Sequence, residues 1–176
     1  IIDANHPLVG IEPSAILTFR DEYPDLCDSN LLETAKLLAA NSFTIEEFMV
    51  REMAKGNITP DQFTTKEKSV LLHGHCQQKS VGSLVSTVQA LTLPANYKVE
   101  VIPSGCCGMA GSFGYEKEHY EISMKIGELV LLPAVRNASH ETLIAAPGTS
   151  CRHQIKDGTG KKALHPVEVL WDALLK

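Results

Sequence analysis

Short apolar runs alternate along the chain with longer segments in which apolar residues recur every three or four positions. The first pattern is typical of buried strands and the second of amphipathic helices. The predicted strands cover residues 7–11, 69–73 and 142–146, together with residues 98–102, where apolar and polar residues alternate. The predicted helices cover residues 15–23, 30–40, 44–55, 77–91, 115–138 and 166–175, with a further helix opening at Cys151. This alternation predicts an α/β fold, a parallel sheet with helices on both faces.

Proline and small polar residues refine the expected ends of these helices. We expect Pro24 to stop the first helix and Pro133 to interrupt the longest one, because proline lacks the N–H that a helix interior requires. Ser29 is an expected N-cap, and so is Ser42 or Thr44 for the helix after it; Thr149 or Ser150 is expected to cap the helix that follows the last strand.

A faint internal repeat links the two ends of the chain. Residues 9–21 resemble residues 145–157 at an offset of 136 positions, and Ala15 then falls on Cys151. Both segments have the pattern of a strand, a turn and a helix. The repeat predicts two pseudo-repeated halves, of which the first is truncated.

We expect the first half to be represented by residues 1–67 and the second half, with the cysteine site, by residues 68–176. The chain starts with neither an initiator methionine nor a signal peptide, so we also expect it to be cut from a longer polypeptide.

Composition narrows the choice of function. A net charge of -5 gives no reason to expect nucleic acid as a partner. No apolar run approaches the roughly 20 residues of a membrane span. We therefore expect a cytoplasmic protein, either free or at the inner face of the membrane. In such a reducing compartment, clustered cysteines bind metals or do redox chemistry more often than they form a disulfide framework.

Four of the five cysteines follow three consecutive predicted strands. Cys76 follows the first of them, Cys106 and Cys107 follow the next, and Cys151 follows the third. Parallel strands place their carboxyl ends on one edge of the sheet, where ligand sites form. The strand order therefore predicts that these four thiols meet, whereas Cys27 is expected to be an ordinary small apolar residue.

The surroundings of these cysteines favour a metal site. Cys151 is expected in the first turn of a helix, where the helix dipole lowers the pKa of a thiol. Gly105 and Gly108 flank the cysteine pair and let the backbone approach a cofactor closely. We expect both glycines, together with Ser150, to contact the bound group.

The histidines near the cysteines are the remaining ligand candidates. His75 precedes Cys76 directly, and His153 follows the last cysteine by two positions, so both are candidate metal ligands. His73 lies close by and could be a ligand, a hydrogen-bond donor to a ligand or a core residue. For His165, just before a proline, helix capping is the simpler interpretation.

The Cys106-Cys107-Gly108 segment resembles the cysteine-rich CCG domain family, which includes a subunit of heterodisulfide reductase and the iron–sulfur subunit of glycolate oxidase. The motif of that family is a cysteine, a long gap, Cys-Cys-Gly, a second long gap and Cys-x-x-Cys. Here 29 residues separate Cys76 from Cys106, and 43 separate Cys107 from Cys151. Within the family the chain is most similar to the C-terminal region of FAD-linked oxidases fused to iron–sulfur modules, over nearly its whole length.

The resemblance implies an electron-transfer module. In such oxidases FAD, bound outside this segment, takes electrons from a 2-hydroxy acid, and iron–sulfur modules pass them to an acceptor such as a quinone. The implied partners are the flavin dehydrogenase domain and a ferredoxin-like domain of the parent protein. The implied cofactor is an iron–sulfur cluster, and the segment alone is not expected to oxidise the substrate.

One departure from the family pattern leaves alternatives open. Gln154 stands where the second cysteine of Cys-x-x-Cys is expected, so four thiolates remain. Four thiolates suit an ordinary [4Fe-4S] cluster or a zinc ion equally well. A structural zinc-binding interaction domain is therefore the alternative function, and a metal-free thiol–disulfide catalyst is the third.

Overall fold

Two parallel sheets organise residues 2–176, which are the residues that this computed structural model describes. The strands are β1 (Leu8–Gly10), β2 (Ser42–Thr44), β3 (Lys68–Leu72), β4 (Tyr97–Val101), β5 (Leu143–Ala145) and β6 (Ala163–Leu164). β1 pairs with β2, and the larger sheet has the order β4-β3-β5-β6. The predicted α/β class with a parallel sheet is confirmed.

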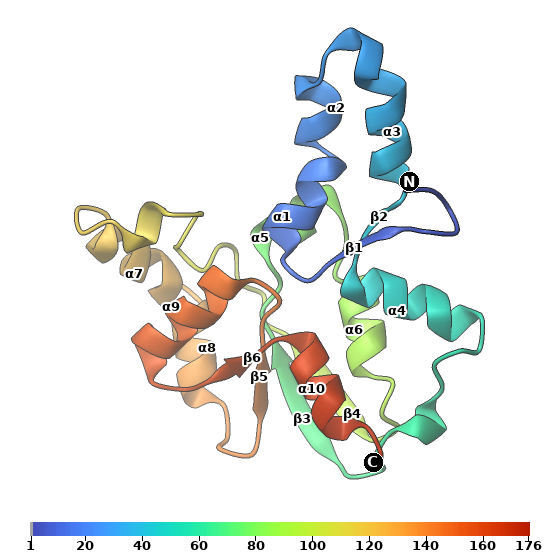
Figure 1. Cartoon of the computed structure of the whole chain (residues 1–176). Helices are drawn as coiled ribbons and strands as arrows, with labels where there is room; N and C mark the ends of the chain where they lie inside the picture. The colour runs from blue at the N-terminus through green and yellow to red at the C-terminus, as the bar shows by residue number, and fades with distance from the viewer. Residues whose placement is uncertain (1) are drawn as a thin grey trace.

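Helices connect the strands and cover the sheet (Figure 1). The α-helices are α1 (Pro13–Ile16), α2 (Glu22–Leu26), α3 (Leu32–Ala40), α4 (Ile45–Ala54), α5 (Cys76–Val81), α6 (Val85–Leu91), α7 (Tyr120–Glu128), α8 (Leu131–Asn137), α9 (Thr149–Thr159) and α10 (Pro166–Ala173). The 3-10 helices are η1 (Leu17–Phe19), η2 (Ser29–Leu31), η3 (Pro60–Gln62) and η4 (Phe113–Tyr115). Among the described residues, none of the helices has the length and apolar character to cross a membrane.

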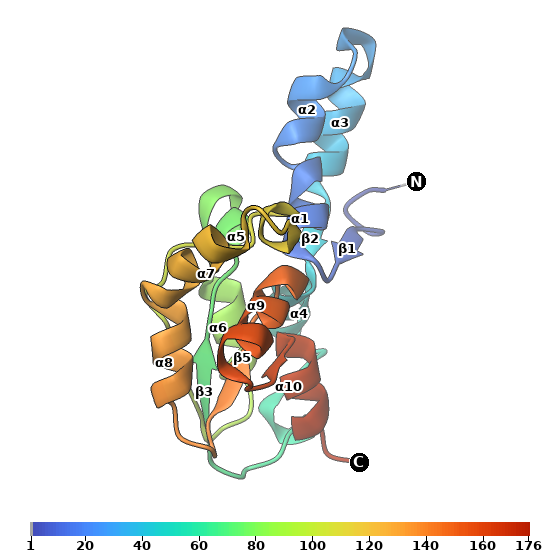
Figure 2. The same cartoon turned by 90° about the vertical axis from the view of Figure 1, so that its left-hand side faces the viewer.

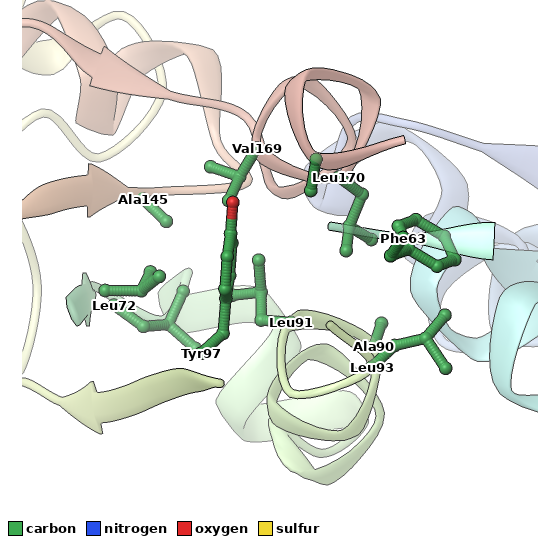
Figure 3. Packing of buried hydrophobic residues seen from close by; sticks show 11 residues of the cluster. Phe63, Leu72, Ala90, Leu91, Leu93, Tyr97, Ala145, Val169 and Leu170 are labelled. Carbon is green, nitrogen blue, oxygen red and sulfur yellow. The ribbon is translucent and has the colours of Figure 1, made fainter. Parts of the chain in front are cut away.

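The four-stranded sheet is buried on both faces, because β3 carries apolar side chains on each. Val70 and Leu72 pack on one face with residues of α6 and α10, and partly buried residues of α4 lie against the same cluster. Figure 3 shows this packing around Leu72, Tyr97 and Val169. On the opposite face, α8 and α9 cover the sheet through residues such as Leu132 and Ile155.

The smaller sheet belongs to an N-terminal unit. In Figures 1 and 2, β1 and β2 lie beside the carboxyl edge of the larger sheet, and α2 and α3 project from them as an arm. Thr44, one of the two expected candidates, caps α4 with a reciprocal capping box that involves Glu47. Arg20 pairs with Glu47 and donates to the Ser42 carbonyl oxygen, which ties the base of the arm to β2.

One expected interruption is confirmed: the predicted helix of residues 115–138 is divided near Pro133, because α7 ends at Glu128 and α8 begins at Leu131. Other predicted boundaries are wrong. Pro24 does not stop a helix but is the third residue of α2, the same position that Pro133 has in α8. The first-turn N–H groups of a helix have no intrahelical acceptor, so proline loses nothing there. The predicted helix of residues 77–91 is likewise two helices, because α5 ends at Gly82.

Candidate metal centre

The four predicted cysteine ligands follow the carboxyl ends of three adjacent strands. Cys76 is the first residue of α5, after β3, and Cys151 is the third residue of α9, after β5. Cys106 and Cys107 lie in the loop after β4. Since β4, β3 and β5 are neighbours in a parallel sheet, the fold itself gathers residues that are far apart in sequence.

The four thiols form a series, Cys76, Cys106, Cys107 and Cys151, in which each thiol influences the pKa of the next. The neighbouring Cys106 raises the pKa values of Cys76 and Cys107. Cys107 in turn holds the pKa of Cys106 well below its usual range and lowers the pKa of Cys151 to about 5. Two sulfurs of the series therefore favour the thiolate form, which is the form that binds a cation.

Burial changes along the series. Cys107 and Cys151 are buried, Cys106 is half-buried and Cys76 is exposed. The inner end therefore lies in a protein environment that excludes water, and the outer end reaches the surface. Cys27 is half-buried, and its thiol donates to the carbonyl oxygen of Pro24, so it takes no part in this group.

His73 joins the inner end of the series. It is the residue directly after β3 and is fully buried. A ring nitrogen of His73 and the sulfurs of Cys107 and Cys151 all lie within 4.8 Å of one another. Sequence reasoning left His73 among three alternatives. The sequence feature that points to His73 as a site residue is its place at the end of an apolar run. Burial is expected there, and a buried histidine requires a specific polar partner.

The two histidines predicted as ligands have other partners. His75 caps α5, because its Nδ1 accepts the N–H of Gln77 at 3.2 Å. His153 is exposed, and its Nδ1 lies 2.6 Å from the hydroxyl oxygen of Tyr115. A metal role for either stays a prediction. His165, expected to be a cap, is the N-cap of α10.

The residues expected to contact a cofactor have different surroundings. Gly108 is buried with φ +103°, and its N–H donates to Cys106 Sγ at 3.2 Å. A Cβ there would lie 2.1 Å from the Ser123 carbonyl oxygen, so only glycine fits. Gly105 is exposed and open around its Cα. Ser150 is half-buried in the first turn of α9 and does not cap that helix.

The expectation of a Thr149 or Ser150 cap is wrong, because Gly148 is the N-cap of α9. A carboxylate from the N-terminal unit instead accepts a free backbone N–H at this end of the helix: Glu12 Oε2 accepts the N–H of Thr149 at 2.8 Å. Burial acts to raise the pKa of Glu12, but the hydrogen bonds from Thr149 and Ser14 outweigh it and leave the pKa below its usual value. Glu12 had no sequence signal, since its partner lies 137 positions away.

The position of the missing cysteine has a structural role. Gln154 is buried on the inner side of α9, and its amide nitrogen donates to the carbonyl and hydroxyl oxygens of Ser123 in α7. These two bonds hold α9 against α7 on the same side as the cysteine loop. Gln154 therefore holds the two helices beside the thiols in position, and its amide nitrogen is already hydrogen-bonded to Ser123.

Curated proteins similar to the chain are dehydrogenases. D-2-hydroxyglutarate dehydrogenase of Escherichia coli (strain K12) is 29% identical over 169 residues, which cover 96% of this chain and 16% of that protein. The protein of the same name from Pseudomonas putida is 29% identical over 171 residues, covering 97% and 15%. A subunit of the anaerobic glycerol-3-phosphate dehydrogenase of Escherichia coli (strain K12) is 26% identical over 170 residues, covering 96% and 40%. The chain thus spans much less than half the length of the first two relatives and two fifths of the third.

No protein-family model matches the chain, and no solved structure matches it. The relatives fit the expected group of dehydrogenases, whereas membership of the CCG family stays a resemblance. What the geometry adds is a cluster of cysteines and one histidine with the donor chemistry of a metal site.

Proposed function

We propose that the chain is an iron–sulfur electron-transfer module of a flavin-linked 2-hydroxy-acid dehydrogenase. The [4Fe-4S] cluster would be held by the four cysteines of the series, Cys76, Cys106, Cys107 and Cys151. The observation that carries this proposal is the convergence of four thiols from the ends of the adjacent strands β3, β4 and β5, where each thiol shifts the pKa of the next. Four thiolates are the donor set that such clusters use.

The surroundings of the thiols fit this cofactor. The backbone N–H of Gly108 already donates to Cys106 Sγ, the kind of hydrogen bond that tunes a cluster potential. Lys79 Nζ holds the loop after β4 by donating to the carbonyl oxygens of Ser104 and Gly105, each at 2.7 Å. Bound there, the cluster would supply one-electron transfer. The buried inner end would exclude water, and the exposed end at Cys76 would face the electron partner.

The partners follow from the same proposal. A flavin dehydrogenase domain and a ferredoxin-like domain of the parent protein would deliver electrons, and a quinone or another acceptor would receive them. The similarity to two kinds of dehydrogenase over nearly the whole chain supports this arrangement. We place the protein in the cytoplasm, either free or at the inner face of the membrane.

We also propose that residues 1–67 are the remainder of a first half and that residues 68–176 are the second half, which carries the cysteine site. The order β1, helices, β2, α4 repeats the order β5, α9, β6, α10, and both strand pairs are parallel. The second helix of each order begins with a capping box, at Thr44 and at His165.

A zinc-binding interaction domain is the second candidate function. One ring nitrogen of His73 and the sulfurs of Cys107 and Cys151 lie within 4.8 Å of one another. Donors this close suit a single tetrahedral ion, to which nitrogen and sulfur bind at about 2.0–2.3 Å. Cysteines of a cluster instead bind different iron atoms.

Anaerobic reconstitution with iron and sulfide separates the two candidates. We expect about four irons and four acid-labile sulfides per chain and a broad charge-transfer absorption in the visible region. The Cys27→Ser variant is the matched control and should reconstitute equally, because Cys27 lies outside the series. One zinc per chain without acid-labile sulfide would replace the iron–sulfur proposal with the zinc one.

A further inference from the structure

His73 is a buried histidine with only one ring nitrogen engaged. Its side chain is fully buried, and its Nδ1 lies 2.8 Å from the hydroxyl oxygen of Ser104. Its Nε2 is buried and has no hydrogen-bond partner among the described residues. A buried polar atom without a partner is unfavourable, so a fold that holds one in place indicates that this atom gains a partner in the functional state.

The backbone of His73 is held firmly in position. Its N–H donates to the Ala145 carbonyl oxygen at 2.8 Å and so continues the pairing of β3 with β5. On the other side, Ser104 is fixed through its carbonyl oxygen, which accepts from Lys79 Nζ. The ring therefore stands between two fixed segments. A ring nitrogen of His73 lies within 4.8 Å of the sulfurs of Cys107 and Cys151, and Nε2 is the nitrogen that Ser104 leaves free.

The other two histidines near the cysteines do not share this arrangement. His75 uses Nδ1 to accept the Gln77 N–H, and its Nε2 lies 4.0 Å from a carboxylate oxygen of Glu12. His153 is exposed and bonded to Tyr115. Among these three, only His73 combines full burial with an unpartnered nitrogen beside two thiols.

We propose that His73 Nε2–H donates a hydrogen bond to the Cys151 thiolate when that thiolate holds the cluster, while the Ser104 hydroxyl donates to Nδ1 and fixes this tautomer. His73 is thus a positioning residue that tunes the reduction potential. This assignment rests on the proposed iron–sulfur function. Reduction adds negative charge to the cluster and its sulfurs, so a donor to sulfur stabilises the reduced form and raises the potential.

The matched pair His73→Leu and His73→Gln tests the assignment in the reconstituted chain. Leucine removes the donor, whereas the glutamine amide can place an N–H near the position of Nε2. At a fixed potential we expect the ratio of reduced to oxidised cluster to fall about tenfold in His73→Leu, or about 59 mV for one electron. His73→Gln should recover most of this loss. His140→Gln, at an exposed position, should not change the ratio.

Iron and sulfide content separates the possible outcomes. Both His73 variants should keep the wild-type content, because the four thiolates remain. An unchanged potential in His73→Leu would overturn the assignment alone, and so would strong direct ¹⁴N coupling in pulsed EPR, which marks an iron-bound nitrogen. A wild-type chain that assembles no cluster would overturn the proposed function, and the assignment with it. Should His73→Leu fail to fold, Ser104→Ala decides: we expect a smaller shift in the same direction, and no shift would overturn the assignment.

Discussion

The junctions β1–α1 and β5–α9 have the same register but different chemistry. Ala15 is the third residue of α1, and Cys151 is the third residue of α9, as the internal repeat aligns them. Ala15 is exposed, whereas Cys151 is buried among thiols and His73. The β1 junction instead supplies Glu12, which reaches across to the first turn of α9.

The neighbours of each strand explain the difference. In the larger sheet β5 lies between β3 and β6, and β4 lies on the other side of β3. The ends of β3, β4 and β5 therefore converge around Cys151. Among the described residues, β1 pairs only with β2, and the residue after β2 is the start of α4. A strand-to-helix junction therefore provides one position for a ligand, and a metal centre needs several adjacent strand ends.

The largest effect should come from Cys151→Ser, which removes the innermost thiolate of the series. We expect loss of the cluster, with iron and acid-labile sulfide close to zero after anaerobic reconstitution, because serine is a poor ligand for iron in such clusters. Metal and sulfide analysis measures this directly, with Cys27→Ser as the control. A Cys151→Ser chain that retained the wild-type iron content would contradict the account.

Gly108→Ala should have the next largest effect, which is a loss of stability. A Cβ at this position would meet the Ser123 carbonyl oxygen at 2.1 Å, and φ is +103°. We expect the free energy of unfolding of the metal-free chain to fall by about 3 kcal/mol, from backbone strain and collision together. Chemical denaturation gives this value.

Gly105→Ala is the matched control for that change. A Cβ at Gly105 meets nothing within 4 Å, and the residue is exposed. Its effect should stay within about 0.5 kcal/mol, as for most surface substitutions. Equal losses in the two variants would show that the cysteine loop does not depend on the close approach at Gly108.

Glu12→Gln should have a moderate effect that depends on pH. Because hydrogen bonds hold the pKa of Glu12 below its usual 4.5, the carboxylate stabilises the fold above that pH, and this contribution is lost as pH falls through the lower folded-state pKa. At neutral pH we expect a loss of about 1 kcal/mol.

Denaturation curves of wild type and Glu12→Gln between pH 7 and pH 3 measure this dependence, and their difference should shrink toward acid. Glu118→Gln, on the exposed surface, should follow wild type throughout. A Glu12→Gln difference that stayed constant with pH would mean that the charge of Glu12 does not link β1 to α9.

Ala15→Cys should have the smallest effect. It gives the β1 junction the thiol that the β5 junction has, but among the described residues β1 has only β2 beside it. We expect the iron and sulfide content of the reconstituted variant to equal that of wild type. Additional iron would show that one thiol at this register is enough, against the explanation from neighbouring strands.

The local sequence pattern predicts the strands whose ends build the site. An apolar run locates β3, and an alternation of apolar and polar residues locates β4, so that the ends from which Cys76 and Cys106 emerge are both predicted. β2 and β6 were missed, because strands of three and two residues carry too little pattern. The convergence of the thiols followed from strand order alone.

The histidines show where sequence reasoning stops. His75 is next to Cys76 in sequence yet serves as a helix cap, while His73, three positions before that cysteine, lies beside the buried thiols. Adjacency along the chain does not determine which way a ring points at the end of a strand. That direction depends on Ser104 and on the pairing of β3 with β5, which the local pattern does not contain.

Reductive EPR of the anaerobically reconstituted chain is the decisive measurement of the cluster. We expect a paramagnetic signal on one-electron reduction that integrates to about one spin per chain, together with about four irons and four sulfides. A chain that takes up one zinc, holds no acid-labile sulfide and gives no signal on reduction would contradict this expectation.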